Sequence, residues 1–322
     1  MNEATPYIGV DVSKSTLDYF IPGERKTRRC ENTPGGAASL ARAALKRGFG
    51  VCCEPTGGYE RKLLEACWGG GVPVATADAW RVRHFAKGRG VLEKTDAIDA
   101  RVIAAFAAQN EMRPIPRPTC AQRELRELTR AIETLDRQIQ VSQGQLEHDG
   151  ACGLVRKTVK AVLRCLQAER ARLDGRRLAV VRGDDRMHSL FVRYQQVKGI
   201  GPATALAMIA EMPELGTVSD KGAAKLIGTA PIPNESGKKT GARAIQRGRF
   251  GARSALYMAA LVATRHNPIL KGFYRRLVDG NGKPRKVAIV AVMRKLVCLL
   301  NRIASDESFE PSPAASKPRP VK

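Results

Sequence analysis

A proline-rich stretch, Arg113-Pro-Ile-Pro-Arg-Pro118, divides the 322-residue chain into two parts with different hydrophobic patterns. Before it, the stretches 6–12, 17–21 and 27–32 read as three successive strands, and further strands then alternate with helical segments. Strands in succession followed by this alternation predict an α/β domain with a mixed sheet over residues 1–112. The prolines mark its boundary, because proline interrupts both helices and central strands.

The segment that follows, residues 113–185, has helical periodicity. Its apolar residues recur at intervals of three and four: Leu125, Leu128, Ile132, Leu135, Ile139 and, after a polar Ser142, Leu146. This heptad spacing predicts a helical coiled-coil linker. A second amphipathic helix, with Leu154, Val162, Leu166 and Leu173, follows the glycines at 150 and 153. The two helices predict either an antiparallel hairpin or a dimerising arm, and the sequence does not separate these.

Residues 186–304 are predicted to form a mainly α domain of short helices and glycine turns, and the proline-rich residues 305–322 a disordered tail. The turn Gln196-Val-Lys-Gly-Ile-Gly-Pro202 resembles a helix-hairpin-helix element. Backbone N–H groups at the start of such a helix can bind a phosphate. The alternative is a tight turn between two helices with no ligand.

Charge is concentrated in the C-terminal part of the chain. The sequence holds 55 Lys and Arg against 31 Asp and Glu, a net charge of +24, of which residues 186–322 contribute 24 basic and 8 acidic side chains. A local excess of this size predicts contact with a polyanion such as nucleic acid. Aromatic residues make up only 5% of the chain, which argues against recognition by base stacking.

Other composition features exclude several classes of protein. The longest apolar runs fall short of the roughly 18 residues that a membrane span needs, and residues 1–7 lack a signal-peptide pattern, so we expect a cytoplasmic protein. The eight cysteines form no CxxC pair and are expected to be reduced and mostly buried. The four histidines are scattered. A zinc site or a Cys–His nucleophile is therefore not expected.

Four carboxylates occupy positions suited to a metal site. Asp11 ends the first predicted strand, Glu54 ends a later one, and Asp96 and Asp99 lie on one face at the start of a helix that Thr95 would cap. Gathered together, they would repel one another unless a divalent cation neutralised them. Two Mg²⁺ ions, which bind carboxylate oxygens, could hold both oxygens of a reacting phosphodiester. Taken singly, each residue is more simply a surface residue or a helix cap.

Three motifs carry a resemblance to a known family: Ile8-Gly-Val-Asp-Val-Ser-Lys14, Glu54-Pro-Thr-Gly-Gly-Tyr59 and Lys94-Thr-Asp-Ala-Ile-Asp-Ala100. They resemble the DEDD signature of transposases of insertion-sequence family one-ten, to which the Piv-type DNA invertases also belong. The resemblance implies a RuvC-like, RNase H-type fold for the first domain. It also implies that Asp11, Glu54, Asp96 and Asp99 are the catalytic, metal-binding tetrad, with Mg²⁺ as the cofactor and Mn²⁺ as a substitute.

Ser236 lies in the segment Pro231-Ile-Pro-Asn-Glu-Ser-Gly-Lys-Lys-Thr-Gly241. A serine hydroxyl needs its proton removed and the charge of the reacting phosphate stabilised before it can act as a nucleophile. On residue types alone a polar loop serine is the simpler interpretation. The resemblance reverses this, because the family's second domain carries an essential serine in a Pro-x-x-x-Ser-Gly-Lys-Lys context, whose Ser-Gly-Lys-Lys part is matched here by Ser236 to Lys239.

Basic residues surround Ser236 and recur towards the C-terminus, and we expect them to contact nucleic-acid phosphates. They are Lys238, Lys239, Arg243, Arg247, Arg249, Arg265, Lys283, Arg285 and Lys286. A solvated helix face is the alternative for Lys283 to Lys286. The sequence contains no base-reading motif, and the resemblance implies that a structured guide RNA, a bridge RNA, selects the target by pairing with both DNAs.

The leading hypothesis is therefore a DNA transposase or recombinase that cuts and rejoins donor and target duplexes through a covalent phosphoserine at Ser236, assisted by the metal-bound tetrad. Because the serine and the carboxylates belong to different domains, we expect a homodimer or tetramer that pairs them. Two alternatives remain open: a RuvC-like nuclease or junction resolvase that uses water, and a non-catalytic nucleic-acid-binding factor.

Overall fold

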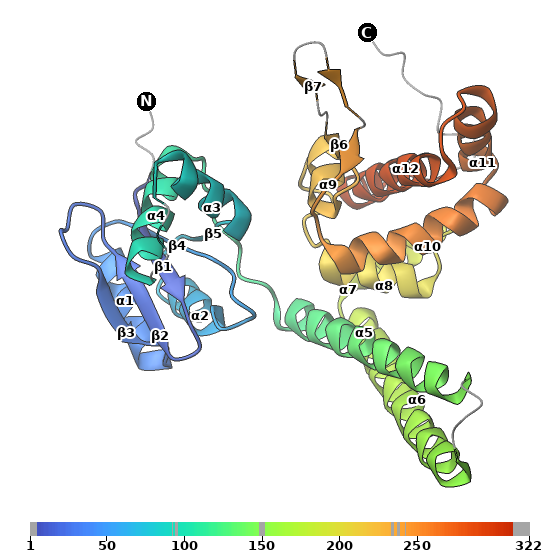
Figure 1. The fold of residues 1–322 in the computed structure, drawn as a ribbon, viewed down its shortest axis with the longest axis horizontal. Helices are drawn as coiled ribbons and strands as arrows, with labels where there is room; N and C mark the ends of the chain where they lie inside the picture. Colours follow the sequence, from blue (N-terminus) through green and yellow to red (C-terminus); the bar gives the residue numbers. More distant parts are fainter. Residues whose placement is uncertain are drawn as a thin grey trace. The chain divides into compact units, whose positions relative to one another are not determined.

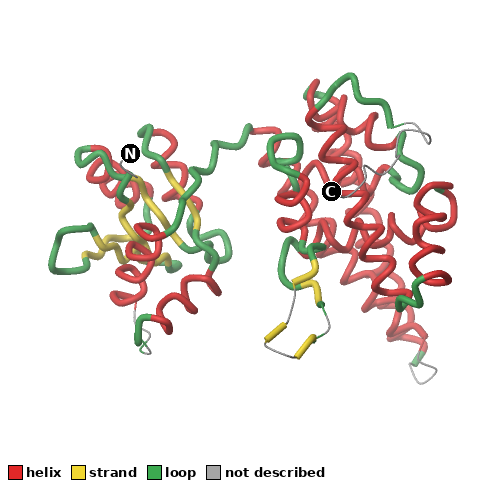
Figure 2. The backbone as a smooth tube through the Cα atoms, turned by 90° about the horizontal axis from the view of Figure 1, so that it is seen from above, coloured by secondary structure: helices red, strands yellow, loops and turns green. Residues whose placement is uncertain are grey.

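A computed structural model of the chain describes residues 5–311 except 92, 94, 95, 148–151, 233, 234, 237, 238 and 242, with the side chains at 96, 97, 235, 236, 239 and 240 also left out. The chain forms two compact units, Met1–Pro118 and Thr119–Lys322. The first is an α/β unit, and the second is helical apart from four short strands (Figures 1 and 2).

The first unit is built on a mixed five-stranded sheet. Its elements are β1 (Tyr7–Val12), β2 (Thr16–Phe20), β3 (Arg28–Glu31), α1 (Pro34–Leu45), β4 (Gly50–Cys53), α2 (Arg61–Gly69), β5 (Val74–Thr76), α3 (Ala79–Gly88) and α4 (Asp96–Gln109). The strand order is β3-β2-β1-β4-β5, with β1–β2 and β2–β3 antiparallel and β1–β4 and β4–β5 parallel. The mixed sheet predicted from the sequence is confirmed.

Alternation along the strands divides the core into two layers. Ile8, Val10 and Leu17 face α1 and α2, where they pack with Leu40 and Leu63. The opposite face packs against α3 and α4, and its core comes from Tyr7, Cys52, Val82, Ile103 and Phe106. Since successive strand residues point to opposite faces, Gly9 and Asp11 lie on the α4 side.

The proline segment ends the first unit by packing against it. The Ile115 N–H donates to the carbonyl of Val74 in the edge strand β5 at 2.7 Å, and the Ile115 carbonyl accepts from the Trp68 indole at 2.9 Å. The prolines thus serve to bring the chain along the sheet edge before the first helix of the second unit begins.

The second unit begins with two long helices, α5 (Cys120–Glu147) and α6 (Gly153–Arg182), which lie side by side (Figure 1). The heptad residues Leu125 and Ile132 are buried in α5, as the spacing predicts. In α6 the expected apolar face is wrong at Leu154 and Val162, which are 74% and 47% exposed. Ion pairs join the helices instead: Arg170 Nε to Asp136 at 2.7 Å and Arg176 Nε to Glu124 at 2.6 Å.

The remaining helices share one core with the base of α5 and α6. They are α7 (Asp185–Gln195), α8 (Pro202–Glu211), α9 (Asp220–Ile227), α10 (Phe250–His266), α11 (Pro268–Arg275), a π-helical turn η1 (Arg276–Gly280) and α12 (Arg285–Ser305). Among the described residues no helix is long and apolar enough to cross a membrane. Residues 306–309, assigned to a disordered tail above, are held by Arg193, which donates to the carbonyls of Asp306 and Phe309.

Candidate active site

Asp11 and Glu54 lie side by side at the carboxyl ends of two neighbouring inner strands, β1 and β4. The strands β1 and β4 are parallel, with Val10 opposite Cys53. Asp11 and Glu54 are the next residues on each strand, so their backbones continue this register side by side. Both side chains are half-buried, and each directly follows a fully buried residue. The position is one where a ligand can reach carboxylates that rest on a rigid sheet.

Asp99 is brought to the same face by an unusually close helix–strand contact. A Cβ added at Gly9 would lie 2.2 Å from the Ala100 carbonyl oxygen and 2.3 Å from the Ala104 nitrogen, so only glycine lets α4 approach β1 this closely. Ala100 is fully buried, and Asp99 immediately precedes it. Asp11 lies two residues after Gly9 on the same face, so the contact places the backbones of Asp11 and Asp99 near each other. Asp96 begins the same helix, and its side chain lies outside the described part of the structure.

The Gly9→Ala variant is expected to destabilise the first unit by about 3 kcal/mol or more, because the added methyl meets backbone atoms that cannot rotate away. Both tryptophans, Trp68 and Trp80, belong to this unit, so their fluorescence during urea denaturation reports its unfolding selectively. Gly35→Ala is a matched control, since a Cβ there meets nothing within 4 Å. Wild-type stability for Gly9→Ala would contradict the assigned role of the contact.

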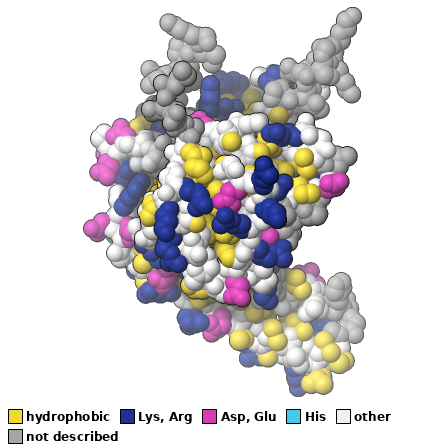
Figure 3. Space-filling view, turned by 90° about the vertical axis from the view of Figure 1, so that its left-hand side faces the viewer, with side chains coloured by type: hydrophobic (Ala, Val, Ile, Leu, Met, Phe, Trp, Pro, Cys, Tyr) yellow, Lys and Arg dark blue, Asp and Glu magenta, His cyan; other side chains and the backbone are white. Residues whose placement is uncertain are grey.

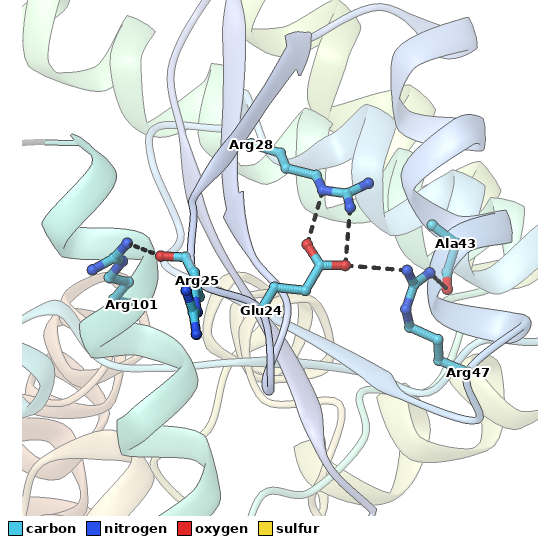
Figure 4. A network of polar contacts seen from close by, with 6 residues as sticks. All are labelled: Glu24, Arg25, Arg28, Ala43, Arg47 and Arg101. Atoms are coloured by element: carbon cyan, nitrogen blue, oxygen red, sulfur yellow. Dashed lines mark hydrogen bonds and ion pairs between the residues drawn. The ribbon is translucent and has the colours of Figure 1, made fainter.

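The start of α4 is also tied to the loop between β2 and β3 (Figure 4). Arg101, two residues after Asp99, donates to the Arg25 carbonyl at 2.6 Å and lies over the Phe20 ring. In the same loop Glu24 pairs with Arg28 of β3 at 2.9 Å and with Arg47, just beyond the end of α1, at 3.2 Å. These contacts position the helix that carries Asp99 relative to the sheet.

Asp18 is a carboxylate near the site that the sequence analysis did not identify. It is the direct cross-strand partner of Asp11 and is 6% exposed. Arg29, its partner on β3, donates from Nε to both carboxylate oxygens, at 3.0 and 3.1 Å. Directly opposed residues share a face of an antiparallel pair, so Asp18 also faces α4. The alternation around Leu17 indicates only which face of its strand Asp18 occupies, whereas its place beside Asp11 depends on the register of β1 and β2.

The donor chemistry of the site fits a hard divalent cation. Asp11, Glu54 and Asp99 supply only carboxylate oxygens, which Mg²⁺ and Mn²⁺ prefer. Among the side chains that the structure describes, no three His, Cys, Asp or Glu are close enough to hold a metal, and Asp96 is not among those side chains. The residues therefore fit a divalent metal ion by the type of their donor atoms and by their shared face of the sheet.

Ser236 lies on an excursion between α9 and α10. The strands β6 (Pro231–Ile232) and β9 (Ala244–Ile245) pair antiparallel at its base, and β7 (Glu235–Ser236) and β8 (Lys239–Thr240) pair further out. Ser236 is the register partner of Lys239, so it stands beside the reversal of the outer ladder. Figures 1 and 2 show this ladder extending away from the helices of its unit. The arrangement presents the serine backbone at the end of a hairpin.

Most of the described basic residues predicted to bind nucleic acid are exposed. Arg243 and Arg247 flank the returning strand β9, Arg265 lies in the last turn of α10, Lys283 precedes α12, and Arg285 and Lys286 begin it. Lys238 is outside the described residues, and the side chain of Lys239 is also not described. Figure 3, viewed from the side of the first unit, shows Lys and Arg spread over that face as well.

Arg249 differs from the other predicted phosphate ligands. It is half-buried, and its guanidinium binds Glu214 with two hydrogen bonds of 2.5 and 2.6 Å. This geometry favours a structural role over the nucleic-acid contact expected from its place in a basic cluster.

The turn 196–201, for which the sequence left a phosphate site or a tight turn open, connects α7 and α8. The Asn267 side-chain amide donates a hydrogen bond of 3.3 Å to the Lys198 carbonyl in this turn.

Two buried cysteines of the first unit have strongly raised pKa values. Burial raises the pKa of Cys52 and of Cys67 to about 12, so neither thiol is ionised near neutral pH. All eight cysteines are free, but the expectation that they are mostly buried is wrong for Cys120, Cys152 and Cys165, which are exposed. These three lie on or next to α5 and α6, away from the carboxylates in the chain.

The comparisons with known proteins agree with these features. The family model DEDD_Tnp_IS110, described as a transposase, matches residues 8–148, and the model of the Transposase IS116/IS110/IS902 family matches residues 193–275. Together the matched segments hold the four carboxylates and Ser236 and cover more than half of the chain.

Two similar curated proteins are the pilin gene-inverting proteins of Moraxella bovis and Moraxella lacunata. Each is 23% identical over 304 residues, which cover 91% of this chain and 94% of the relative. Among solved structures, Thermus thermophilus RuvC is similar to 34% of this chain and 99% of its own length, at 17% identity and a TM-score of 0.25. On the two family models, which match both units of the chain, this protein belongs to the IS110 family of transposases.

Proposed function

We propose that this transposase cuts and rejoins DNA by covalent catalysis at Ser236, with Asp11, Glu54, Asp96 and Asp99 as the acidic half of the site. The observation that carries the proposal is the pairing of two features in one chain. Asp11, Glu54 and Asp99 lie on or beside one face of a rigid sheet, and Ser236 stands near the reversal of a hairpin among basic residues. The curated relatives are named as gene-inverting proteins, which supports a recombination reaction.

In this reaction the Ser236 Oγ gives up its proton and forms a bond to a DNA phosphorus, while the bond from that phosphorus to a deoxyribose oxygen breaks. The released oxygen takes up a proton. After strand exchange, a deoxyribose hydroxyl attacks the phosphoserine and restores the serine, so no phosphodiester energy is lost. The exposed Arg243 and Arg247 of the hairpin and the exposed basic residues around the start of α12 hold the phosphates.

The carboxylates bind divalent metal ions, for which Mg²⁺ is the expected choice and Mn²⁺ a substitute. When bound, two such ions supply charge stabilisation for the attacking and leaving oxygens. The chain's own contribution is to hold the carboxylates on a rigid face and to balance the charge of the neighbouring Asp18 with Arg29. The serine and the tetrad lie on separate units, so the scissile phosphate must reach both, within one chain or between protomers of a dimer or tetramer.

Target choice is assigned to a structured guide RNA that pairs with donor and target DNA. This part of the proposal rests on the family resemblance and on the lack of a base-reading motif in the sequence. Exposed lysine and arginine side chains that contact nucleic-acid phosphates suit a mechanism in which the RNA selects the sequence and the protein holds the DNA.

The test uses protein purified from its host with any bound RNA. The RNA is sequenced and compared with the DNA that flanks the gene, and the complex is then incubated with this DNA and Mg²⁺ and denatured. We expect RNA segments complementary to both flanks and a nucleotide adduct on the tryptic peptide that contains Ser236, identified by mass spectrometry. Cleaved DNA without any adduct would instead support the nuclease that uses water. No cleavage and no adduct would support the non-catalytic factor.

A further inference from the structure

The hairpin that carries Ser236 is closed at its base by a contact between two glycines. Gly228 ends α9 with a φ of 79° and Gly248 precedes α10 with a φ of 84°. A Cβ on Gly228 would lie 2.0 Å from the Arg247 carbonyl oxygen, and one on Gly248 would lie 2.3 Å from the Gly228 nitrogen. The departing and returning chains therefore touch backbone to backbone, in conformations that favour glycine. We call residues 228–230 and 247–249 the neck.

Backbone hydrogen bonds fix both sides of the neck to the last turn of α9. The buried Thr229 donates its N–H to the Ala224 carbonyl at 2.9 Å, and the Ala230 N–H donates to the same oxygen at 3.2 Å. On the returning side, the Arg249 N–H donates to the Leu226 carbonyl at 3.1 Å. Both ends of the excursion thus share one anchor.

A side-chain clamp completes the neck. The Arg249 Nη1 and Nη2 atoms donate to Glu214 Oε2 and Oε1 at 2.6 and 2.5 Å, and Nη1 also donates to the Glu211 carbonyl at 2.5 Å. Glu214 lies in the loop that follows α8, and Arg249 directly precedes α10. The clamp therefore ties the point where the hairpin rejoins the helices to a second part of the helical core. Such two-point pairs fix orientation as well as distance.

The charges at the clamp stay ionised in the folded protein. Burial opposes ionisation of Glu214, but the hydrogen bonds and the charge of Arg249 outweigh it and hold the Glu214 pKa below its ordinary value. Burial also opposes the charge on Arg249, and Glu214 outweighs it and raises the Arg249 pKa. Two arginines of α5 also lie near this cluster of charges: Arg126 interacts electrostatically with Glu214 and Arg249, and Arg130 Nε is 3.9 Å from Glu211 Oε1. A compensated arginine of this kind has little capacity left for a phosphate.

We propose that Glu214 and Arg249 are positioning residues for Ser236, acting through the neck rather than on the DNA. This inference rests on the proposed role of Ser236. The paired segments of the hairpin are two residues long on each strand, too short to set a direction by themselves. The neck therefore sets the position of the hairpin backbone that carries Ser236, and a displacement of about 1 Å at a reacting group can cost roughly 100-fold in rate.

The test is a double-mutant cycle on the full-length protein with its RNA, comprising Glu214→Gln, Arg249→Gln and the double variant. We expect each single variant to slow formation of the Ser236 adduct by 10-fold to 100-fold, and the double variant to be no slower than either, because one pair is broken in all three. Affinity for uncleaved DNA should stay within about twofold of wild type. Arg243→Gln, on the exposed part of the same hairpin, is the matched control and should weaken DNA binding and reduce its salt dependence.

Hydrogen exchange of the amides in 229–249, measured without DNA or metal, separates this inference from the proposed function. Faster exchange there in both single variants, with unchanged exchange in α10 and α12, supports the neck even if wild-type protein forms no adduct. Wild-type exchange in the variants overturns it. So does a loss of DNA affinity and salt dependence in Arg249→Gln that Glu214→Gln does not share, since that pattern makes Arg249 a phosphate ligand.

Discussion

Replacing Ser236 with alanine is expected to abolish the covalent protein–DNA adduct completely while DNA affinity changes by less than about twofold. Alanine lacks the Oγ atom that would bond to phosphorus, and no charge that holds the DNA is altered. The measurement is a denaturing gel of labelled DNA after incubation with protein, RNA and Mg²⁺, together with binding of uncleaved DNA to the same preparation.

Ser254→Ala provides the matched control. Ser254 is an exposed serine in α10 of the same unit, so its loss removes a hydroxyl without touching the hairpin. It should retain the wild-type adduct yield. If Ser236→Ala still nicks DNA and Asp11→Asn does not, water is the nucleophile and the protein acts as a metal-dependent nuclease. If both variants keep every activity, the carboxylates and the serine have no catalytic role.

Local patterns were sufficient to predict the elements that support the carboxylates. The apolar runs that end at Asp11 and Glu54 and the helix that starts at Asp96 are observed within a residue or two of the predicted bounds. Hydrophobic periodicity sets these features, and it can be read without knowing what each strand pairs with. The mixed directions of the sheet followed from three strands in succession before the first helix.

Features that depend on distant parts of the chain were missed. Asp18 joins the site because β1 and β2 pair in one particular register, and Gly9 matters because a helix that begins at residue 96 crosses it. Neither fact is encoded in the residues next to it. Gly9 lies inside the first motif and Asp18 four residues after that motif ends, but their roles become visible only once the strands are paired and α4 is placed on the sheet.

Arg249 shows that the sequence alone also does not reveal which arginines are paired within the protein. In sequence it is one of several basic residues that follow Ser236, and its partner Glu214 lies 35 residues earlier. A cluster of like charges predicts polyanion binding on average, yet an individual arginine can be compensated by a carboxylate brought in by the fold. Assignment of phosphate ligands within such a cluster requires the structure, because exposure and pairing differ from one residue to the next.

Asp11→Asn is expected to slow adduct formation by about 1,000-fold at saturating DNA. Asparagine keeps the shape of the side chain but removes one charge from the acidic group, and a metal ion that stabilises charge in a phosphoryl-transfer reaction contributes several kcal/mol, at about 1.4 kcal/mol per factor of ten. DNA affinity should be unchanged or slightly increased, since a negative charge near the phosphates is lost. Rates are compared across a titration of Mg²⁺ and of Mn²⁺.

The thermal stability of wild type and of Asp11→Asn, with and without Mg²⁺, tests independently whether Asp11 binds a metal ion. Without metal, the repulsion near Glu54, Asp99 and the buried Asp18 that Asp11→Asn removes should offset the loss of the contacts that Asp11 makes, so the variant should be at least as stable as wild type. Added Mg²⁺ should raise the unfolding temperature of wild type more than that of the variant, as expected for a ligand that binds only the folded state. Asp78→Asn is the control. Asp78 caps α3 by accepting a hydrogen bond from the Arg81 N–H at 2.9 Å, and asparagine caps helices equally well, so the variant should match wild type in both assays. Equal metal responses in wild type and Asp11→Asn would remove Asp11 from the metal site and leave its position on the sheet as a structural feature alone.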